Sequence, residues 1–203
     1  IPIVGCLIIS ILIAFLLANV SISGFYIIGL FELLVGFSIG FTFKYLILYS
    51  NFTNYDKLHY VIIGTIGLAY ILNQYFQYEI ILFENNYDRI GFFEFLKIKF
   101  EQGLTFKKIN TGWIGLIIHW LLQLAITYYV TVMVVIRNLT KYQLARVPRE
   151  VVDFAIYHFV KDKAEDQVRK ELALKGWTET QTQDEVFEAI GALQTIQEVN
   201  RMQ

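Results

Sequence analysis

Two side chains capable of acid–base chemistry lie inside otherwise apolar stretches of this 203-residue chain: Glu32 and His119. An ionisable group within a membrane span is costly unless it is paired or neutral, so each is expected to have a partner. Counted from one membrane face, Glu32 is seven residues past Phe25 and His119 is eight past Thr111. At 1.5 Å per residue both lie roughly 10–12 Å deep. The sequence therefore predicts that the carboxylate and the imidazole meet.

Three amides are expected to join this pair. Asn73 and Gln77 lie near the end of one apolar stretch, and Gln123 follows His119 after one helical turn. Burial and a neighbouring charge shift pKa values, so the cluster could exchange protons or bind a small solute. The alternative is a structural hydrogen-bond network that fixes the register of the helices. The predicted polar cluster consists of Glu32, Asn73, Gln77, His119 and Gln123.

No catalytic signature accompanies these residues. The sequence lacks the phosphate-binding pattern G-x-x-x-x-G-K-[ST], the nucleophile elbow G-x-S-x-G and the zinc motif H-E-x-x-H. Its histidines, His59, His119 and His158, are far apart and have no Cys or carboxylate at metal-ligand spacing. We therefore expect no catalytic residue, no metal, no cofactor and no enzymatic activity.

The elements that position the cluster are predicted to be transmembrane helices. The chain is 56% hydrophobic and only 17% charged, whereas a soluble domain typically carries about 25% charged residues. The run 111–136 contains no charge and is longer than the about 20 residues needed to cross a bilayer. Residues 1–137 are thus predicted to be an all-α bundle with four transmembrane helices, at about 1–20, 25–47, 58–80 and 111–136.

Small residues predict how two of these helices pack. The second span carries the pair Gly36 and Gly40, a GxxxG element that lets helices approach closely. In the fourth span every fourth residue from 115 to 131 is small or polar, which places these residues on one face. We expect the two faces to form a seam, with Thr127 and Thr131 serving packing alone. The predicted helix-packing glycines are Gly29, Gly36, Gly40 and Gly115.

The segment 89–102 mixes aromatic and charged residues too densely to cross a membrane. This composition predicts a helix lying in the membrane interface, which Gly103 would end. Lys107 and Lys108 would then lie at headgroup level. A structural collar is the favoured interpretation, and an element that gates substrate access is the alternative.

The C-terminal region 138–203 is predicted to be a small, acidic helical domain. Residues 150–203 hold 11 Asp or Glu against 6 Lys or Arg, an excess that argues against nucleic-acid binding. Helical periodicity predicts three short amphipathic helices, with Gly176 ending the second and Thr182 with Glu185 forming a capping box for the third. Because so small a domain buries little core, we expect it to pack on the end of the fourth span, on a second copy or on a partner protein.

Charge and composition also predict where the protein resides. Arg137, Lys141, Arg146 and Arg149 follow the last span, and cations favour the cytoplasmic side. Frequent Ile, Phe, Tyr, Asn and Lys resembles proteins of low-GC bacteria. We therefore expect a multi-pass protein of the bacterial inner membrane with a cytoplasmic tail. Since the sequence begins Ile-Pro-Ile-Val-Gly without Met or a charged leader, we expect it to start inside a longer protein.

Three functional classes fit these features. The favoured one is a structural or accessory subunit, or scaffold, of a membrane complex, because this role explains the amphipathic tail and the absent catalytic motifs together. The second is a small oligomeric transporter or channel module that uses Glu32 and His119. The third is a lipid-modifying membrane enzyme in which one of these two residues is the acid or base.

Overall fold

The computed structural model forms eight helices and one pair of two-residue strands over the residues it describes. The prediction of an all-α chain is confirmed in this respect. The chain divides into two compact units, Ile1–Val135 and Ile136–Gln203, and each is described by itself. The described residues are 2–23, 27, 29–50, 52–85, 90–106 and 109–201.

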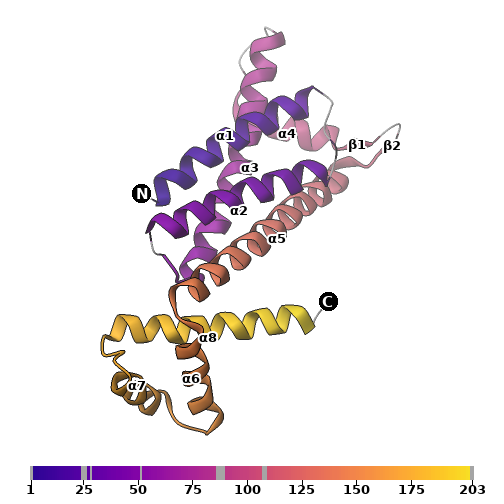
Figure 1. Ribbon diagram of the computed structural model, residues 1–203. Coiled ribbons are helices and arrows are strands. Elements are labelled where there is room, and N and C mark those ends of the chain that lie inside the picture. Colours follow the sequence, from indigo (N-terminus) through magenta and orange to yellow (C-terminus); the bar gives the residue numbers. More distant parts are fainter. Residues whose placement is uncertain are drawn as a thin grey trace. The chain divides into compact units, whose positions relative to one another are not determined.

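Five helices build the first unit, and the last of them continues into the second (Figure 1). Within the described ranges, three helices are long and apolar enough to cross a membrane, namely α1, α2 and α5. The third helix falls outside this set because polar residues such as Asn73, Gln74 and Gln77 interrupt its apolar sequence. The five helices are α1 (Pro2–Ile22), α2 (Leu30–Ser50), α3 (Tyr55–Asn85), α4 (Phe92–Gln102) and α5 (Gly112–Arg146).

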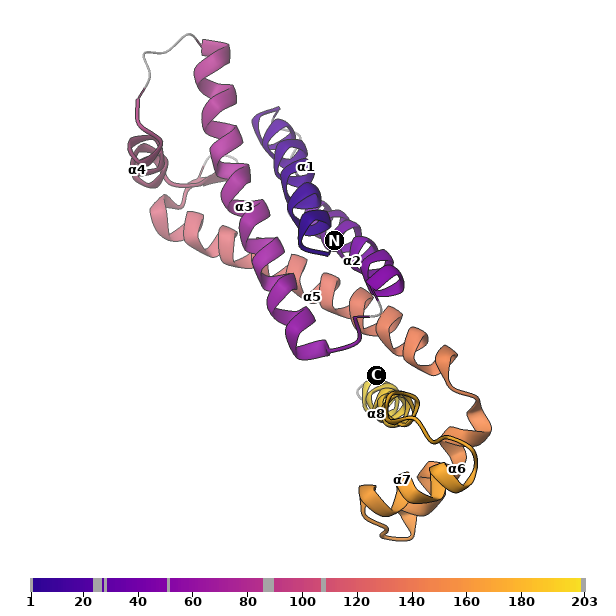
Figure 2. The same ribbon diagram turned by 90° about the vertical axis from the view of Figure 1, so that its left-hand side faces the viewer.

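Helix α3 packs along α1, as both ribbon views show (Figures 1 and 2). Small side chains allow this contact, since Ala14 and Ala18 on α1 and Ala69 on α3 are completely buried. The Ser10 hydroxyl on α1 donates a hydrogen bond to the Thr65 carbonyl oxygen on α3, at 3.1 Å. The two helices are therefore joined by close apolar packing and by one buried polar bridge.

Two of the predicted packing glycines lie where α2 meets α5. A Cβ atom on Gly36 would lie 2.8 Å from Val130 Cβ, and one on Gly40 would lie 2.7 Å from Val134 Cβ. The Thr131 hydroxyl donates a hydrogen bond to the Gly36 carbonyl oxygen at 3.2 Å. Only glycine leaves room for this approach of the two backbones.

The other two glycines do not belong to this seam, and their predicted role is wrong. Gly29 precedes α2 with φ +89°, and a Cβ there would meet nothing within 4 Å. A Cβ on Gly115 would collide with the side chain of Thr111, just before α5 begins, rather than with α2. The helical period alone could not show that Gly29 lies before the first turn of α2. It also could not show that Gly115 faces the residue that precedes α5.

Helix α4 lies beside the C-terminal half of α3 (Figure 2). It ends at Gly103, whose φ of +67° favours glycine. Residue 89, the first of the predicted segment, lies outside the described residues, as do Lys107 and Lys108. A short antiparallel strand pair connects α4 to α5: β1 (Thr105–Phe106) and β2 (Ile109–Asn110).

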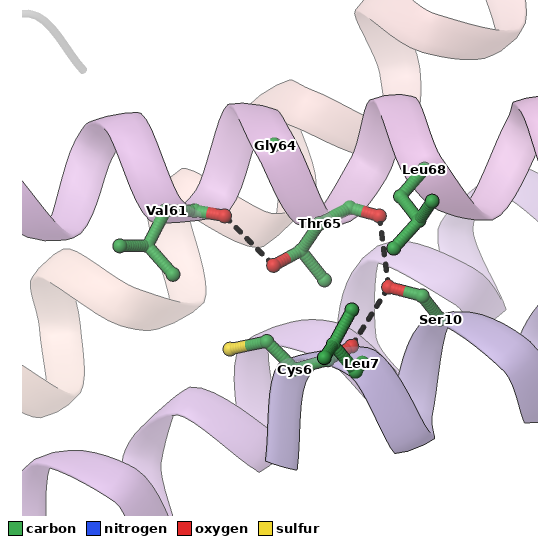
Figure 3. A pocket seen from close by; sticks show the side chains of 7 residues that line it. All are labelled: Cys6, Leu7, Ser10, Val61, Gly64, Thr65 and Leu68. Atoms are coloured by element: carbon green, nitrogen blue, oxygen red, sulfur yellow. Dashed lines mark hydrogen bonds between the residues drawn. The ribbon is translucent and has the colours of Figure 1, made fainter. Parts of the chain in front are cut away.

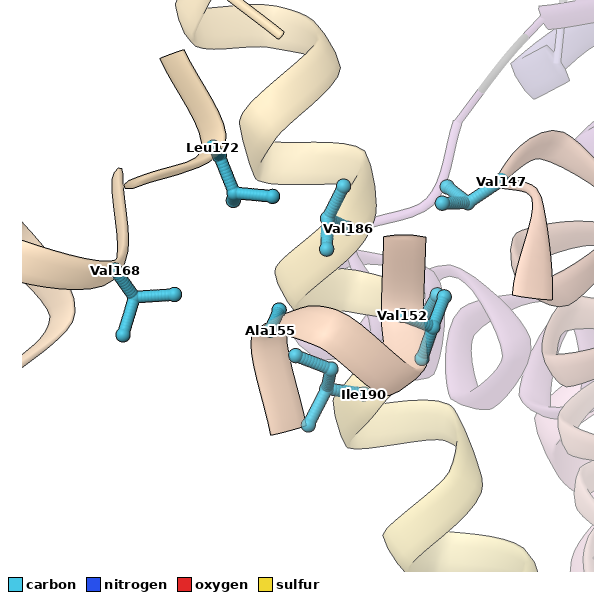
Figure 4. Packing of buried hydrophobic residues seen from close by; sticks show 8 residues of the cluster. Val147, Val152, Ala155, Val168, Leu172, Val186 and Ile190 are labelled. Atoms are coloured by element: carbon cyan, nitrogen blue, oxygen red, sulfur yellow. The ribbon is translucent and has the colours of Figure 1, made fainter. Parts of the chain in front are cut away.

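The second unit contains three helices around its own hydrophobic core (Figure 4). Val168, Leu172 and Val186 are completely buried in this core. Three further core residues are Val147, Val152 and Ile190. The helices are α6 (Arg149–Val160), α7 (Glu165–Leu174) and α8 (Thr180–Arg201).

The chain reverses between α7 and α8 through a Schellman motif. Gly176 adopts φ +95°, its amide donates to the Ala173 carbonyl oxygen at 3.1 Å, and the Trp177 amide donates to that of Leu172 at 3.0 Å. The predicted capping box at Thr182 is wrong. Helix α8 already begins at Thr180, and the Thr182 hydroxyl donates to the Glu179 carbonyl oxygen instead of accepting from an amide.

The seam between α2 and α5 predicts an unusual response to Gly→Ala substitution. Alanine is favoured over glycine inside a helix by about 1 kcal/mol. Gly36→Ala and Gly40→Ala should nevertheless lower the thermal unfolding temperature in detergent, because the added carbon must displace Val130 or Val134, and overpacking costs about 1–3 kcal/mol. Circular dichroism melting curves measure this.

The matched control is Gly67→Ala on α3, where an added Cβ would meet no heavy atom within 4 Å. This variant should melt at or above the temperature of the unsubstituted protein. Equal melting temperatures for Gly36→Ala and Gly67→Ala would contradict the close approach of α2 and α5.

Candidate functional site: a buried polar cluster

Glu32 is completely buried at the start of α2. Its Oε2 atom accepts a hydrogen bond from the Gly29 amide at 2.6 Å. Gly29 is the residue before the first helical position, so the carboxylate satisfies an amide that the helix leaves without a backbone partner. A negative charge in the first turn is also favoured by the helix dipole. This local geometry explains how a carboxyl group is accommodated here.

The amides of α3 form the next part of the cluster. Asn73 and Gln77 are buried one turn apart, and Gln77 Nε2 donates a hydrogen bond to Asn73 Oδ1 at 3.1 Å. The Oε1 atom of Gln77 therefore remains available to accept a hydrogen bond from another helix.

Helix α4 supplies that donor. Lys99 Nζ donates hydrogen bonds to Gln77 Oε1 and to Gln74 Oε1, both at 2.7 Å. Burial lowers the pKa of the Lys99 amine to about 8, because a desolvated ammonium group is less stable than one in water. Lys97, two residues earlier, instead leaves 76% of its side chain exposed. Lys99 thus extends the predicted cluster.

His119 and Gln123 lie one turn apart on α5. Gln123 is buried and His119 is partly buried. The Glu32 carboxylate and the Lys99 amine both lie close enough to the His119 ring to act on it electrostatically. The structure therefore brings an acid, an imidazole and an amine from three different helices into one neighbourhood.

A buried hydrogen bond continues the polar region along α5. The hydroxyl groups of Tyr70 and Thr127 lie 2.8 Å apart and share a hydrogen bond, and Glu32 also acts electrostatically on Tyr70. Thr127 was expected to serve packing alone, so its role is wider than predicted. Tyr70 was not predicted, because an isolated tyrosine in an apolar run gives no signal that its hydroxyl is buried.

Aromatic contacts fix α4 against both neighbouring helices. The ring centroids of Tyr78 and Phe95 lie 5.5 Å apart, and those of Phe100 and Trp120 lie 5.3 Å apart. The Tyr78 hydroxyl also donates to the Ile90 carbonyl oxygen at 2.8 Å. Because α3 carries Tyr78 and α5 carries Trp120, α4 joins these two helices next to the cluster.

The spacing of residues within 89–102 contains a signal for Lys99, which the predicted cluster does not include. Residues three and four positions apart share one face of a helix. In a helix Phe92, Phe95 and Lys99 follow this spacing, and Phe92 and Phe95 both contact Tyr78. The helical face that carries the aromatic anchors therefore also carries the amine.

The cluster has groups that can bind and release protons, but it lacks a metal-ligand arrangement. Within the described ranges, His, Cys, Asp and Glu form no group of three that could hold a metal ion. Comparisons with protein-family models, with curated proteins and with solved structures found no match. Functional inference therefore depends on the geometry of the chain itself.

Proposed function

We propose that this protein is a structural or accessory subunit, or scaffold, of a membrane complex, and that its C-terminal unit docks other proteins. The observation that carries the proposal is the separate hydrophobic core of the unit Ile136–Gln203. A tail that only anchored or solubilised the spans would need no core of its own. A folded tail can instead present a defined surface to a partner.

That surface includes exposed apolar side chains. Val160, at the end of α6, is 77% exposed, and Leu174, at the end of α7, is 83% exposed. Tyr157 on α6 is 53% exposed. Exposed apolar residues at interaction surfaces gain stability when a partner covers them. Residues 150–203 carry five more acidic than basic groups (11 against 6), which favours a partner with basic groups around its apolar contact.

The proposal includes a fourth membrane span formed by α3. Its 31 residues measure about 46 Å at 1.5 Å per residue, more than the about 30 Å of a bilayer core. The amides Asn73 and Gln77 are buried, whereas Tyr60 and Ile71 are 74% and 65% exposed. This distribution, with amides inside the protein and larger side chains on its surface, supports the proposed fourth span.

Helix α4 would then lie in the interface at the non-tail side, with its exposed Phe93 toward lipid headgroups. The cations Arg137, Lys141 and Arg146 at the C-terminal end of α5 favour a cytoplasmic tail, in a bacterial inner membrane.

Co-purification tests the docking role. Val160→Asp combined with Leu174→Asp should reduce recovery of a stoichiometric partner from native membranes at least tenfold, because the charges oppose burial of both positions. The control, Thr178→Asp with Gln181→Asp, adds equal charge at exposed polar positions and should retain the partner. Quantitative mass spectrometry of the purified complexes measures the ratio. Equal recovery of the partner with both variants would contradict the scaffold role. So would a protein that has lost the partner while the cells keep their normal phenotype.

A second candidate function is proton exchange across the membrane by an oligomer. The specific observation that favours it is that a buried Glu32 and a Lys99 amine bonded to Gln74 and Gln77 both act electrostatically on His119. Groups of different basicity in a desolvated site are suited to taking up and releasing a proton.

Reconstituted vesicles test this second candidate. After an external acid pulse, a trapped pH-sensitive dye should report acidification that Glu32→Gln or Lys99→Met slows at least tenfold. Lys97→Met is the control, since its amine lies outside the cluster, and it should leave the rate unchanged. Rates equal to those of protein-free vesicles for every variant, including the unsubstituted protein, would rule out proton exchange.

A further inference from the structure

Two groups of opposite charge act on the His119 ring. They are the Glu32 carboxylate on α2 and the Lys99 amine on α4. Because the pKa of Lys99 is about 8, its amine is positively charged at pH 7. While the imidazole is neutral, one negative charge therefore balances one positive charge. A proton on His119 would add a second cation to a site where one carboxylate is already matched, and an unbalanced charge is costly away from water.

The carboxylates of the two helices that carry and bind Lys99 do not correct this imbalance. Glu79 on α3 and both Glu94 and Glu101 on α4 are exposed, so water weakens their effect. Asp56 lies in the first turn of α3, more than five turns before Gln77. Helix α1 carries no charged residue. The excess charge is therefore removed most readily if one of the two cations leaves.

Lys99 is the cation that can leave, because it belongs to a peripheral helix. Every residue of α4 keeps part of its surface exposed, so none is fully buried. His119 instead lies within α5, which is long and apolar enough to span a membrane. Elements with little buried surface separate from a fold at a lower free energy than core elements. Moving α4 thus costs less packing than moving α5.

The C-terminal end of α4 is fixed to the start of α5, which gives the helix a pivot. The Thr111 amide donates to the Leu104 carbonyl oxygen at 2.8 Å, and the Leu104 amide donates to that of Gly112 at 3.1 Å. At the other end of α4, Phe92 contacts Tyr75 and Tyr78 of α3 through its ring. Release of Lys99 would therefore let the N-terminal end of α4 swing away from α3.

Helix α3 itself has a fixed support on its other side. An apolar groove between α1 and α3 is lined by seven residues, and none of them is charged (Figure 3). The dashed lines in Figure 3 show that its hydroxyls, on Ser10 and Thr65, donate to backbone carbonyl oxygens. A proton gained by His119 changes none of these contacts, so α3 can serve as the reference for a movement of α4.

We propose that Lys99 is a proton-sensitive latch, which holds α4 on α3 while His119 is neutral and releases α4 when His119 gains a proton. The imidazole takes this proton from water, and the Glu32 carboxylate balances the resulting imidazolium. Lys99 keeps its own proton and moves into water. The inference rests on the second candidate function, since it gives the same proton site a means of regulation.

The separation of two nitroxide labels tests the latch in the full-length chain. The labels are attached at Phe93→Cys on α4 and Ile71→Cys on α3, after Cys6→Ala has removed the one native cysteine. Both positions are exposed, at 83% and 65%. Ile71 precedes Tyr75, which contacts α4, by one helical turn.

Electron paramagnetic resonance of frozen vesicles, with equal pH on both sides, measures the separation. Between pH 7.5 and pH 5, where histidine ordinarily changes its charge, a second population should appear whose labels are farther apart by about 10 Å, the diameter of a helix. An unchanged separation would overturn the proposal. It would show that α4 stays docked and that the charge is relieved in another way, such as loss of the Lys99 proton.

Two variants identify the groups responsible. His119→Gln cannot gain the proton, and Lys99→Gln lacks the second cation, so each should give the same separation at both pH values. His59→Gln is the control, because His59 lies near the start of α3 beside Tyr128, and it should respond like the parent. A pH response that persists in His119→Gln or Lys99→Gln would overturn the latch.

The latch and the proton exchange on which it rests fail in distinguishable ways. The separation of the labels is measured without a proton gradient, so a pH response that needs both His119 and Lys99 supports the latch even where vesicles show no proton flux. Vesicles that do acidify through the unsubstituted protein, combined with a separation that does not change with pH, would refute the latch alone.

Discussion

Polar groups buried among membrane-spanning helices must find partners within the protein, because hydrocarbon offers none. Two charged groups of the first unit illustrate this constraint. The Glu32 carboxylate accepts from the Gly29 amide, and the Lys99 amine donates to Gln74 and Gln77. The second arrangement requires α4 to lie against α3. The position of α4 therefore depends on the burial of one amine as well as on aromatic packing.

Because of the same constraint, α3 carries polar side chains on one side and small side chains on another. Toward the cluster it presents amides that hydrogen-bond one another and Lys99, whereas toward α1 it presents small residues such as Ala69. Where a hydroxyl occurs on the α1 side, at Thr65, it is bonded to its own helix and leaves an apolar groove. One helix thus carries buried amides on one side and part of an apolar groove on another.

Sequence patterns predicted the helices and the close approach at Gly36, because each depends on local composition or on helical period. They did not predict Lys99 in the cluster. The alternation of aromatic and charged residues in 89–102 indicated an interfacial surface, and only docking on α3 decides which lysine points inward. Likewise, the role of Gly29 depends on where α2 begins.

The most direct measurement of the central claim, that the Lys99 amine is buried in the cluster, is the pH dependence of stability. In the unfolded chain a lysine keeps its ordinary pKa of about 10.4, whereas burial lowers that of folded Lys99 to about 8. Between these two values the unfolded chain binds one more proton than the folded chain, so the free energy of unfolding should rise with pH. Below pH 8 Lys99 is protonated in both states, so it should add nothing to this slope. Chemical unfolding in detergent should show that Lys99→Gln removes this rise and that Lys97→Gln retains it. Identical slopes for Lys99→Gln and the unsubstituted protein would contradict the account.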